Sequence, residues 1–78
     1  MSTDSDLINV ADTIEVLKLY FKGKMVKHIK NVYVMLNAPM AIHDHTDYIS
    51  AIEKEIEAIA EYDDKLSVLN KYFSGKME

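Results

Sequence analysis

The chain has no cysteine, arginine, tryptophan or glutamine, and its 78 residues include one proline and two glycines. Without cysteine, neither a disulfide nor a thiolate metal site can stabilise the fold. Without arginine, no side chain offers the bidentate fork that recognises phosphate and carboxylate groups. Two glycines are too few to build a phosphate-binding loop, which excludes the nucleotide-binding glycine motifs. Stability therefore depends on the packing of apolar side chains.

The length of the chain is close to the lower limit at which one core outweighs conformational entropy. We therefore expect residues 1–78 to form a single domain, with short flexible ends, that associates with another chain. The N-terminal segment is acidic and polar, and nowhere do about 18 apolar residues follow one another. These features predict a cytoplasmic protein without a targeting segment or a membrane partner.

Apolar residues recur at helical spacing on both sides of Pro39. The first stripe predicts a helix over about residues 5–36, in which Gly23 projects away from the apolar side and weakens the helix by roughly 1 kcal/mol. A break at Gly23 is the competing interpretation. The spacing lengthens to consecutive fours around Phe21 and Met25, which indicates a stutter in the heptad pattern. The stripe comprises Leu7, Val10, Ala11, Ile14, Leu17, Phe21, Met25, Ile29, Val32 and Leu36.

The second stretch alternates steps of three and four, the pattern of a coiled-coil seam, and predicts a helix over about residues 45–73. Pro39 prevents the first helix from continuing, and Gly75 suits a C-terminal cap of the second. The sequence therefore predicts an all-α, antiparallel two-helix hairpin that self-associates, most simply as a dimeric four-helix bundle. The predicted seam comprises Ile49, Ile52, Ile56, Ile59, Asp63, Leu66, Asn70 and Phe73.

Charge also favours an antiparallel hairpin. Residues 17–36 contain five lysines and no acid, whereas residues 41–64 contain eight acids and one lysine. The two blocks lie side by side when the chain reverses, although each exposed pair is worth under about 1 kcal/mol. At matching heights, Lys18 and Asp63 interrupt the two stripes. We expect them to form a partly buried ion pair, within one hairpin or through a second chain, that fixes the helix register. The alternative is that both side chains reach solvent.

The stretch AIHDHTDY is the part of the sequence that most resembles a metal-binding or proton-transfer site. His43 and His45, with Asp44 and Asp47, offer up to four metal ligands, but residues two apart on a helix do not share a face. The simpler interpretation is that Asp44 or Thr46 caps the second helix, while Asp47 adds favourable negative charge to its first turn. We expect no specific metal site, and metal binding by the two histidines stays the alternative.

No motif for hydrolysis, phosphate binding or metalloprotease chemistry occurs, and a two-helix fold offers no pocket that would perturb a carboxylate. We therefore expect neither catalysis nor a cofactor. His28, at the edge of the first stripe, is expected to face Glu55. The lysines of the first helix spread around its circumference beside an acidic helix, in a chain of net charge −4. This arrangement argues against nucleic acid as the partner.

What remains is an interaction protein that binds itself and an unidentified second protein, acting as an adaptor, inhibitor or assembly factor. The expected assembly residues are Leu17, Phe21, Met25, Ile52, Ile56, Ile59, Leu66 and Phe73. Apolar side chains off the first stripe form a candidate partner surface, unless the dimer core uses them: Val16, Leu19, Tyr20 and Val34. Two alternatives stay open: a nucleic-acid-binding hairpin dimer that uses the lysines of the first helix, and a helical subunit of a filament or secretion apparatus.

Overall fold

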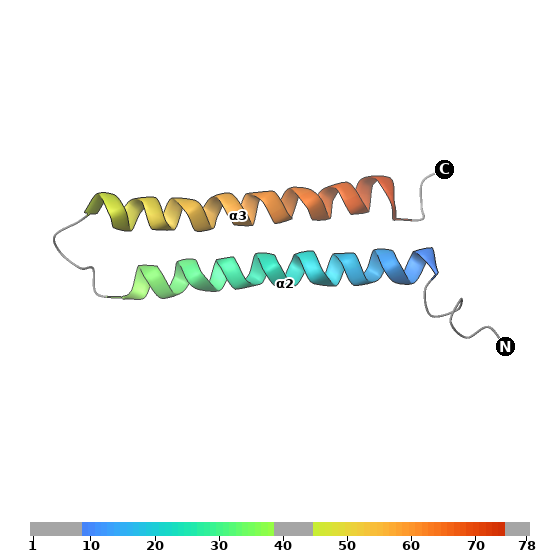
Figure 1. The fold of residues 1–78 in the computed structure, drawn as a ribbon, viewed down its shortest axis with the longest axis horizontal. Coiled ribbons are helices and arrows are strands. Elements are labelled where there is room, and N and C mark those ends of the chain that lie inside the picture. The colour runs from blue at the N-terminus through green and yellow to red at the C-terminus, as the bar shows by residue number, and fades with distance from the viewer. Residues whose placement is uncertain (1–8, 39–44, 75–78) are drawn as a thin grey trace.

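A computed structural model describes residues 9–38 and 45–74. These residues form two α-helices, α2 over Val10–Asn37 and α3 over His45–Tyr72. The helices run antiparallel and side by side, so the start of α2 and the end of α3 lie at the same end of the molecule (Figure 1). Each helix has 28 residues and is therefore about 42 Å long. The predicted all-α hairpin is confirmed.

Asn9 sets the start of α2. Its backbone is extended, with φ −81° and ψ 171°, and its side chain accepts a hydrogen bond from the backbone N–H of Asp12 at 2.8 Å. Its carbonyl accepts hydrogen bonds from the backbone N–H and the hydroxyl of Thr13. The negative charge of Asp12 in the first turn complements the helix dipole. Because Asn9 supplies this cap, α2 begins at Val10 rather than near residue 5.

The ends of α3 agree with the predicted span to within one residue. The helix begins at His45 and ends at Tyr72, and the backbone N–H of Phe73 still bonds to the carbonyl of Leu69 at 2.9 Å. Three predicted features lie outside the described residues, namely the turn at Pro39, the cap at Asp44 and the cap at Gly75.

Helix α2 continues without a break through Gly23, as its continuous apolar stripe predicts. Gly23 is exposed, and a Cβ atom added there would meet nothing within 4 Å. The helix is held together on the opposite side, where the shielded residues on either side of Gly23 contact the same partner helix. Contacts of this kind outweigh the low helix propensity of one glycine.

The contact between the helices follows a heptad pattern on α3, and on α2 it does so apart from two consecutive steps of four. The hydroxyl of Tyr48 donates to the carbonyl of Met35, and the rings of Phe21 and Tyr62 lie 6.0 Å apart between centroids. Shielded positions recur every three or four residues, so successive layers stack along the hairpin. They comprise Ile14, Leu17, Phe21, Met25, His28, Val32 and Met35 on α2, and Tyr48, Ile52, Glu55, Ile59, Tyr62, Leu66 and Leu69 on α3.

Helix α3 contacts α2 through a different seam from the one that its spacing predicts. Ile52, Ile59 and Leu66 face α2 as expected. The other predicted row, which comprises Ile49, Ile56, Asp63 and Asn70, is exposed, and the residues one position earlier take its place. The predicted row would have placed two polar side chains between the helices, whereas the rotated helix places Tyr62 and Leu69 there. Burying polar groups without partners is costly, which explains the rotation.

Helix α2 keeps the stutter that its spacing predicts, because the shielded Leu17, Phe21 and Met25 follow one another at two consecutive steps of four. After Phe21 and Met25 the shielded positions are His28, Val32 and Met35, which keep the alternation of three and four, and Leu36 is exposed. The alternation resumes at this point because the polar His28 joins the contact through its interaction with Glu55 on α3.

The core of the hairpin is thin. Leu69, at 7% exposure, is the one buried side chain in the described part of the chain, and thirteen large apolar side chains there are exposed. A helix in a pair covers only the side that faces its neighbour, so its other sides stay open. Neither described helix is apolar enough over a sufficient length to cross a lipid bilayer.

Replacing Leu69 with alanine should lower the free energy of unfolding by about 2–3 kcal/mol, because two helices cannot refill the space left by its methyl groups. Val68→Ala is the matched control, since Val68 is the preceding residue on α3 and is 40% exposed. It should change the free energy of unfolding by less than about 0.5 kcal/mol. Urea denaturation followed by circular dichroism, at one protein concentration, measures both. Equal effects would contradict the position of Leu69 in the contact.

Candidate interaction surfaces

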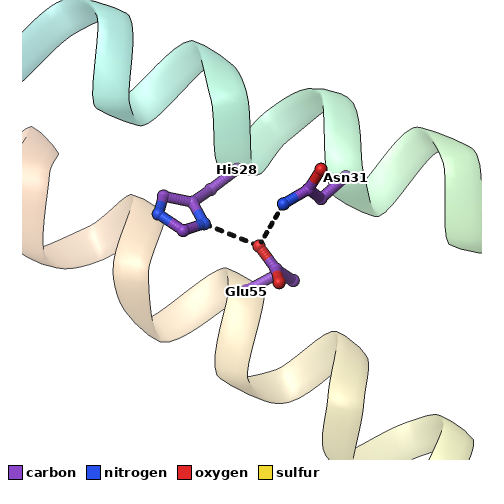
Figure 2. Close-up of polar contacts among 3 residues, drawn as sticks. All are labelled: His28, Asn31 and Glu55. Atoms are coloured by element: carbon purple, nitrogen blue, oxygen red, sulfur yellow. Dashed lines mark hydrogen bonds and ion pairs between the residues drawn. The ribbon is translucent and has the colours of Figure 1, made fainter.

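A polar cluster occupies the middle of the contact between the helices (Figure 2). His28 Nδ1 lies 2.6 Å from Glu55 Oε1, and Asn31 Nδ2 donates to the same oxygen at 3.1 Å. The side chains of His28 and Glu55 are only 18% and 20% exposed, and the His28 ring stacks on Tyr62. The expectation that His28 faces Glu55 is confirmed. Sequence reasoning does not identify Asn31, because no apolar period marks it.

The hydrogen bonds in this cluster stabilise the charged form of Glu55. The bond to His28, followed by the one to Asn31, holds the pKa of the Glu55 carboxyl below its usual 4.5, and partial desolvation opposes this shift. The cluster also specifies how the helices align. A slip of seven residues would place Glu55 against Phe21 or Met35, where its charge would have no partner. A single polar layer thus fixes the register, as buried polar residues do in coiled coils.

The ion pair expected between Lys18 and Asp63 is not formed within one chain. Asp63 is exposed and Lys18 is half-buried. Since Phe21 lies beside Tyr62, a step of three residues along each helix places Lys18 level with Lys65 rather than with an acid. Within one hairpin, the register is therefore held by His28 and Glu55.

Lys65 covers the aromatic layer of the contact. Its ammonium lies 5.5 Å from the centre of the Phe21 ring and 4.9 Å from that of Tyr62, in cation–π geometry. The same ammonium donates to Glu61 at 3.1 Å, which raises the pKa of Lys65. A charged residue thus shields the rings while its own charge stays near solvent.

One side of the hairpin carries an apolar surface, here called the isoleucine face. It comprises the exposed Leu36 of α2 and Ile49 and Ile56 of α3, together with the half-buried Ile29, Ile52 and Ile59 at the border of the contact between the helices. A groove near the open end identifies this side, because Lys22 of α2 and Leu66 and Asn70 of α3 line it together. Residues seven apart lie on the same side of a helix, so Lys22 shares its side of α2 with Ile29 and Leu36. In the same way, Leu66 and Asn70 share their side of α3 with the four isoleucines that this helix contributes to the face. Ile49 and Ile56 are 60% and 52% exposed.

A second apolar row lies on the side of α2 that points away from α3. This outer row comprises Val16, Leu19, Gly23, Val26, Lys30 and Tyr33, at alternating steps of three and four. Gly23 and Val26 lie about half a helical turn from Phe21 and His28, which face α3. The four large apolar members are between 52% and 62% exposed. Helix α2 therefore presents two heptad rows on opposite sides.

The structure separates the predicted assembly residues into two groups. Leu17, Phe21, Met25, Ile52, Ile59 and Leu66 are half-buried between the helices, whereas Ile56 and Phe73 are exposed. The four predicted partner-surface residues, Val16, Leu19, Tyr20 and Val34, are all exposed. The sequence prediction does not include Gly23 and Val26, which belong to the same outer row as Val16 and Leu19. The regular spacing of three and four along this row would have identified them.

The candidate metal site is largely outside the described residues, because His43 and Asp44 precede the start of α3. Thr46 and Asp47 fall in the first turn of that helix. Within residues 9–38 and 45–74, no three histidine, aspartate or glutamate side chains gather in a way that could hold a metal ion.

The lysines of α2 do not form one basic stripe. Lys18 and Lys24 are half-buried, and Lys24 lies over the ring of Tyr20 at 5.6 Å from its centre. Lys22, Lys27 and Lys30 are exposed and point to different sides of the helix. A groove or stripe that tracks a phosphate backbone needs cations on one side.

The lowered pKa of Glu55 makes the stability of the hairpin depend on pH. Because the folded state holds the charged form, the stabilisation is present above the ordinary glutamate pKa and is lost as the pH falls below it. Glu55→Gln should therefore be less stable than the unchanged protein at pH 7, and the two should converge as the pH falls through the lowered pKa of Glu55. Glu57→Gln, a change at an exposed carboxylate on the same helix, is the control. Urea titrations across this pH range measure the differences, and a constant gap for Glu55→Gln would contradict the assignment.

Comparisons with protein-family models, curated proteins and solved structures found no match to this chain. A function for the chain must therefore be argued from its own surfaces. The two that stand out are the isoleucine face and the outer row of α2.

Proposed function

We propose that this chain is a helical homodimer that acts as a non-enzymatic protein-interaction module. The observation that carries the proposal is the thin core, because Leu69 alone is buried in the described residues while thirteen large apolar side chains there stay exposed. Scattered apolar residues on a surface are normal. Here seven of the thirteen fall in the outer row or on the isoleucine face, at coiled-coil spacing, and such rows are the surfaces through which helices bind other helices.

The isoleucine face is the proposed dimer interface. Two helices of about 42 Å, spaced 8–10 Å apart, present a face roughly 20 Å wide and therefore on the order of 800 Å² in area. This is the area that each partner contributes to a stable interface of standard size. Packing two such faces against each other gives a four-helix bundle and shields the isoleucine side chains.

Charge and apolar pattern favour one of the two symmetric arrangements. Because His28 is level with Glu55, the neighbouring Ile29 and Ile56 are nearly level, and Lys22 is nearly level with Asp63. If both loops lie at the same end of the bundle, α2 of one copy packs on α3 of the other. Apolar then meets apolar, and Lys22 meets the partner's Asp63. If the loops lie at opposite ends, α2 packs on α2 and α3 packs on α3. The isoleucines of one copy then meet the half of the partner's α3 that carries Asp63 and Asn70.

The dimer with both loops at the same end gives a role to the polar residues that interrupt the apolar stripes. Lys18 and Lys22 line the groove next to Leu66, while Asp63 lies one turn from Leu66 on α3. An ion pair between copies would use these charges to select the orientation of the dimer rather than to strengthen one hairpin. A Lys–Asp pair of the kind expected from the sequence is thus compatible with an exposed Asp63 if the lysine and the aspartate belong to different copies.

Light scattering coupled to size exclusion should give twice the chain mass of 8.9 kDa at micromolar concentration. Ile56→Glu should weaken the dimer at least about tenfold, because it removes an apolar contact and brings a charge into the interface of both copies. Val68→Glu is the matched control, since Val68 is a partly exposed apolar residue on the side of α3 away from the isoleucine face.

A folded monomer of the unchanged chain at these concentrations would overturn the proposal. Dissociation by Val68→Glu with no effect of Ile56→Glu would place the interface elsewhere. Circular dichroism of each variant shows whether the helices are retained, so loss of the dimer can be told from loss of the fold.

A further inference from the structure

We propose that the outer row of α2 is a docking site for an acidic amphipathic helix of a different protein. The row is built as one half of a coiled coil, because Val16, Leu19, Val26 and Tyr33 fall at heptad positions and are all exposed. Helix α3 lies on the opposite side of α2, and the isoleucine face lies to one flank. The inference therefore goes beyond the proposed function and does not depend on the dimer.

Gly23 gives this row a shape that a partner can use. It sits between Leu19 and Val26, and a Cβ atom built there would meet nothing within 4 Å. The ridge of side chains is thus interrupted by an open hollow at its centre. In helix pairs, a side chain of one helix inserts into a hole between side chains of the other. A glycine in the middle of a helix lowers helix stability. Room for a large apolar side chain of a partner would explain why a glycine occupies this position.

Charge identifies the kind of helix that fits. From residue 16 to residue 38 the chain carries five lysines and no acid. Lys27 flanks the outer row, Lys30 lies within it, and both are exposed. Glutamates at the flanking positions of a partner helix would meet these ammonium groups, whereas lysines would be repelled.

A second copy of this chain does not fit the row. If two outer rows packed against each other, the lysines of one α2 would lie against those of the other. The outward side of α3 is acidic, but its Glu53, Glu57 and Asp64 accompany no apolar row at heptad spacing. Apart from Val68 and Tyr72, the large apolar residues of α3 lie instead at the contact with α2 and on the isoleucine face. The remaining occupant is a helix from another protein.

A membrane surface is a poorer occupant than a helix. The row is one side chain wide and has a hollow at its centre, which suits a single inserted residue rather than a flat layer of lipid. The chain also carries a net charge of −4, which opposes approach to an anionic bilayer.

The test uses the full chain and a synthetic fluorescent peptide about three heptads long, with leucine at the a and d positions and glutamate at the e and g positions. Fluorescence anisotropy should show binding in the micromolar range, roughly tenfold or more tighter than binding of a matched peptide with lysine at e and g. Val26→Ser should weaken binding of the glutamate peptide about tenfold, while Val68→Ser on α3 should change it less than about twofold.

Two further variants separate docking from folding and from charge alone. Gly23→Ala should raise the melting temperature of the chain, because alanine favours helix and the added Cβ has space, yet it should weaken peptide binding. The double variant Lys27→Glu with Lys30→Glu should reverse the preference, so that the lysine peptide binds more tightly than the glutamate peptide.

The proposal is overturned if Val26→Ser and Gly23→Ala bind the glutamate peptide as tightly as the unchanged chain, or if Ile56→Ser weakens binding instead. It is also overturned if phosphatidylserine vesicles bind through Val26, or if Val26→Ser lowers the oligomeric mass of the chain, which would make the row a surface for lipid or for a second copy. Failure of peptide binding with the dimer intact would refute this inference and leave the proposed function standing.

Discussion

A helix in a two-helix hairpin has one neighbour, and this constraint determines most of what the molecule exposes. One side of α2 and one side of α3 are shielded, and among the described residues Leu69 alone is buried. Covering the other sides requires helices beyond α2 and α3. Seven of the thirteen exposed large apolar residues fall in the outer row or on the isoleucine face, so these two surfaces resemble the helix-packing surfaces inside a larger helical bundle.

Within that constraint, the hairpin uses polar residues to define its alignment and apolar residues to gain stability. His28, Asn31 and Glu55 form the one polar layer between otherwise apolar layers, and their hydrogen bonds are satisfied across the helices. Such a layer contributes less stability than leucines of the same volume would, but it is mispaired in every shifted register. Lys65, stretched over Phe21 and Tyr62, closes the aromatic layer without adding an unpaired charge to it.

The sequence predicts the number, type and direction of the helices because apolar period and charge blocks are local patterns. It predicts the exact rotation of α3 less well. Ile49 and Ile56 lie three residues before Ile52 and Ile59, and Tyr48 and Glu55 lie four residues before them. Either pair completes an alternation of three and four, and only the tertiary contact decides which row turns inward. The choice depends on Asp63 and Asn70, which are hidden in one rotation and exposed in the other. The position of His28 at the edge of the apolar stripe predicts its contact with Glu55, whereas Asn31 has no signal in the sequence. The outer row has one, in the regular spacing from Val16 to Tyr33.

The central claim is that a second copy covers the isoleucine face with both loops at the same end. Because the chain lacks cysteine, Asn37→Cys introduces a single spin label at the loop end of α2. Double electron–electron resonance then measures the distance between the labels of two copies. The account predicts a distance below about 35 Å, the width of a four-helix bundle with its label arms. A distance on the order of 45 Å or more, close to the helix length, or the absence of dipolar coupling, would contradict it.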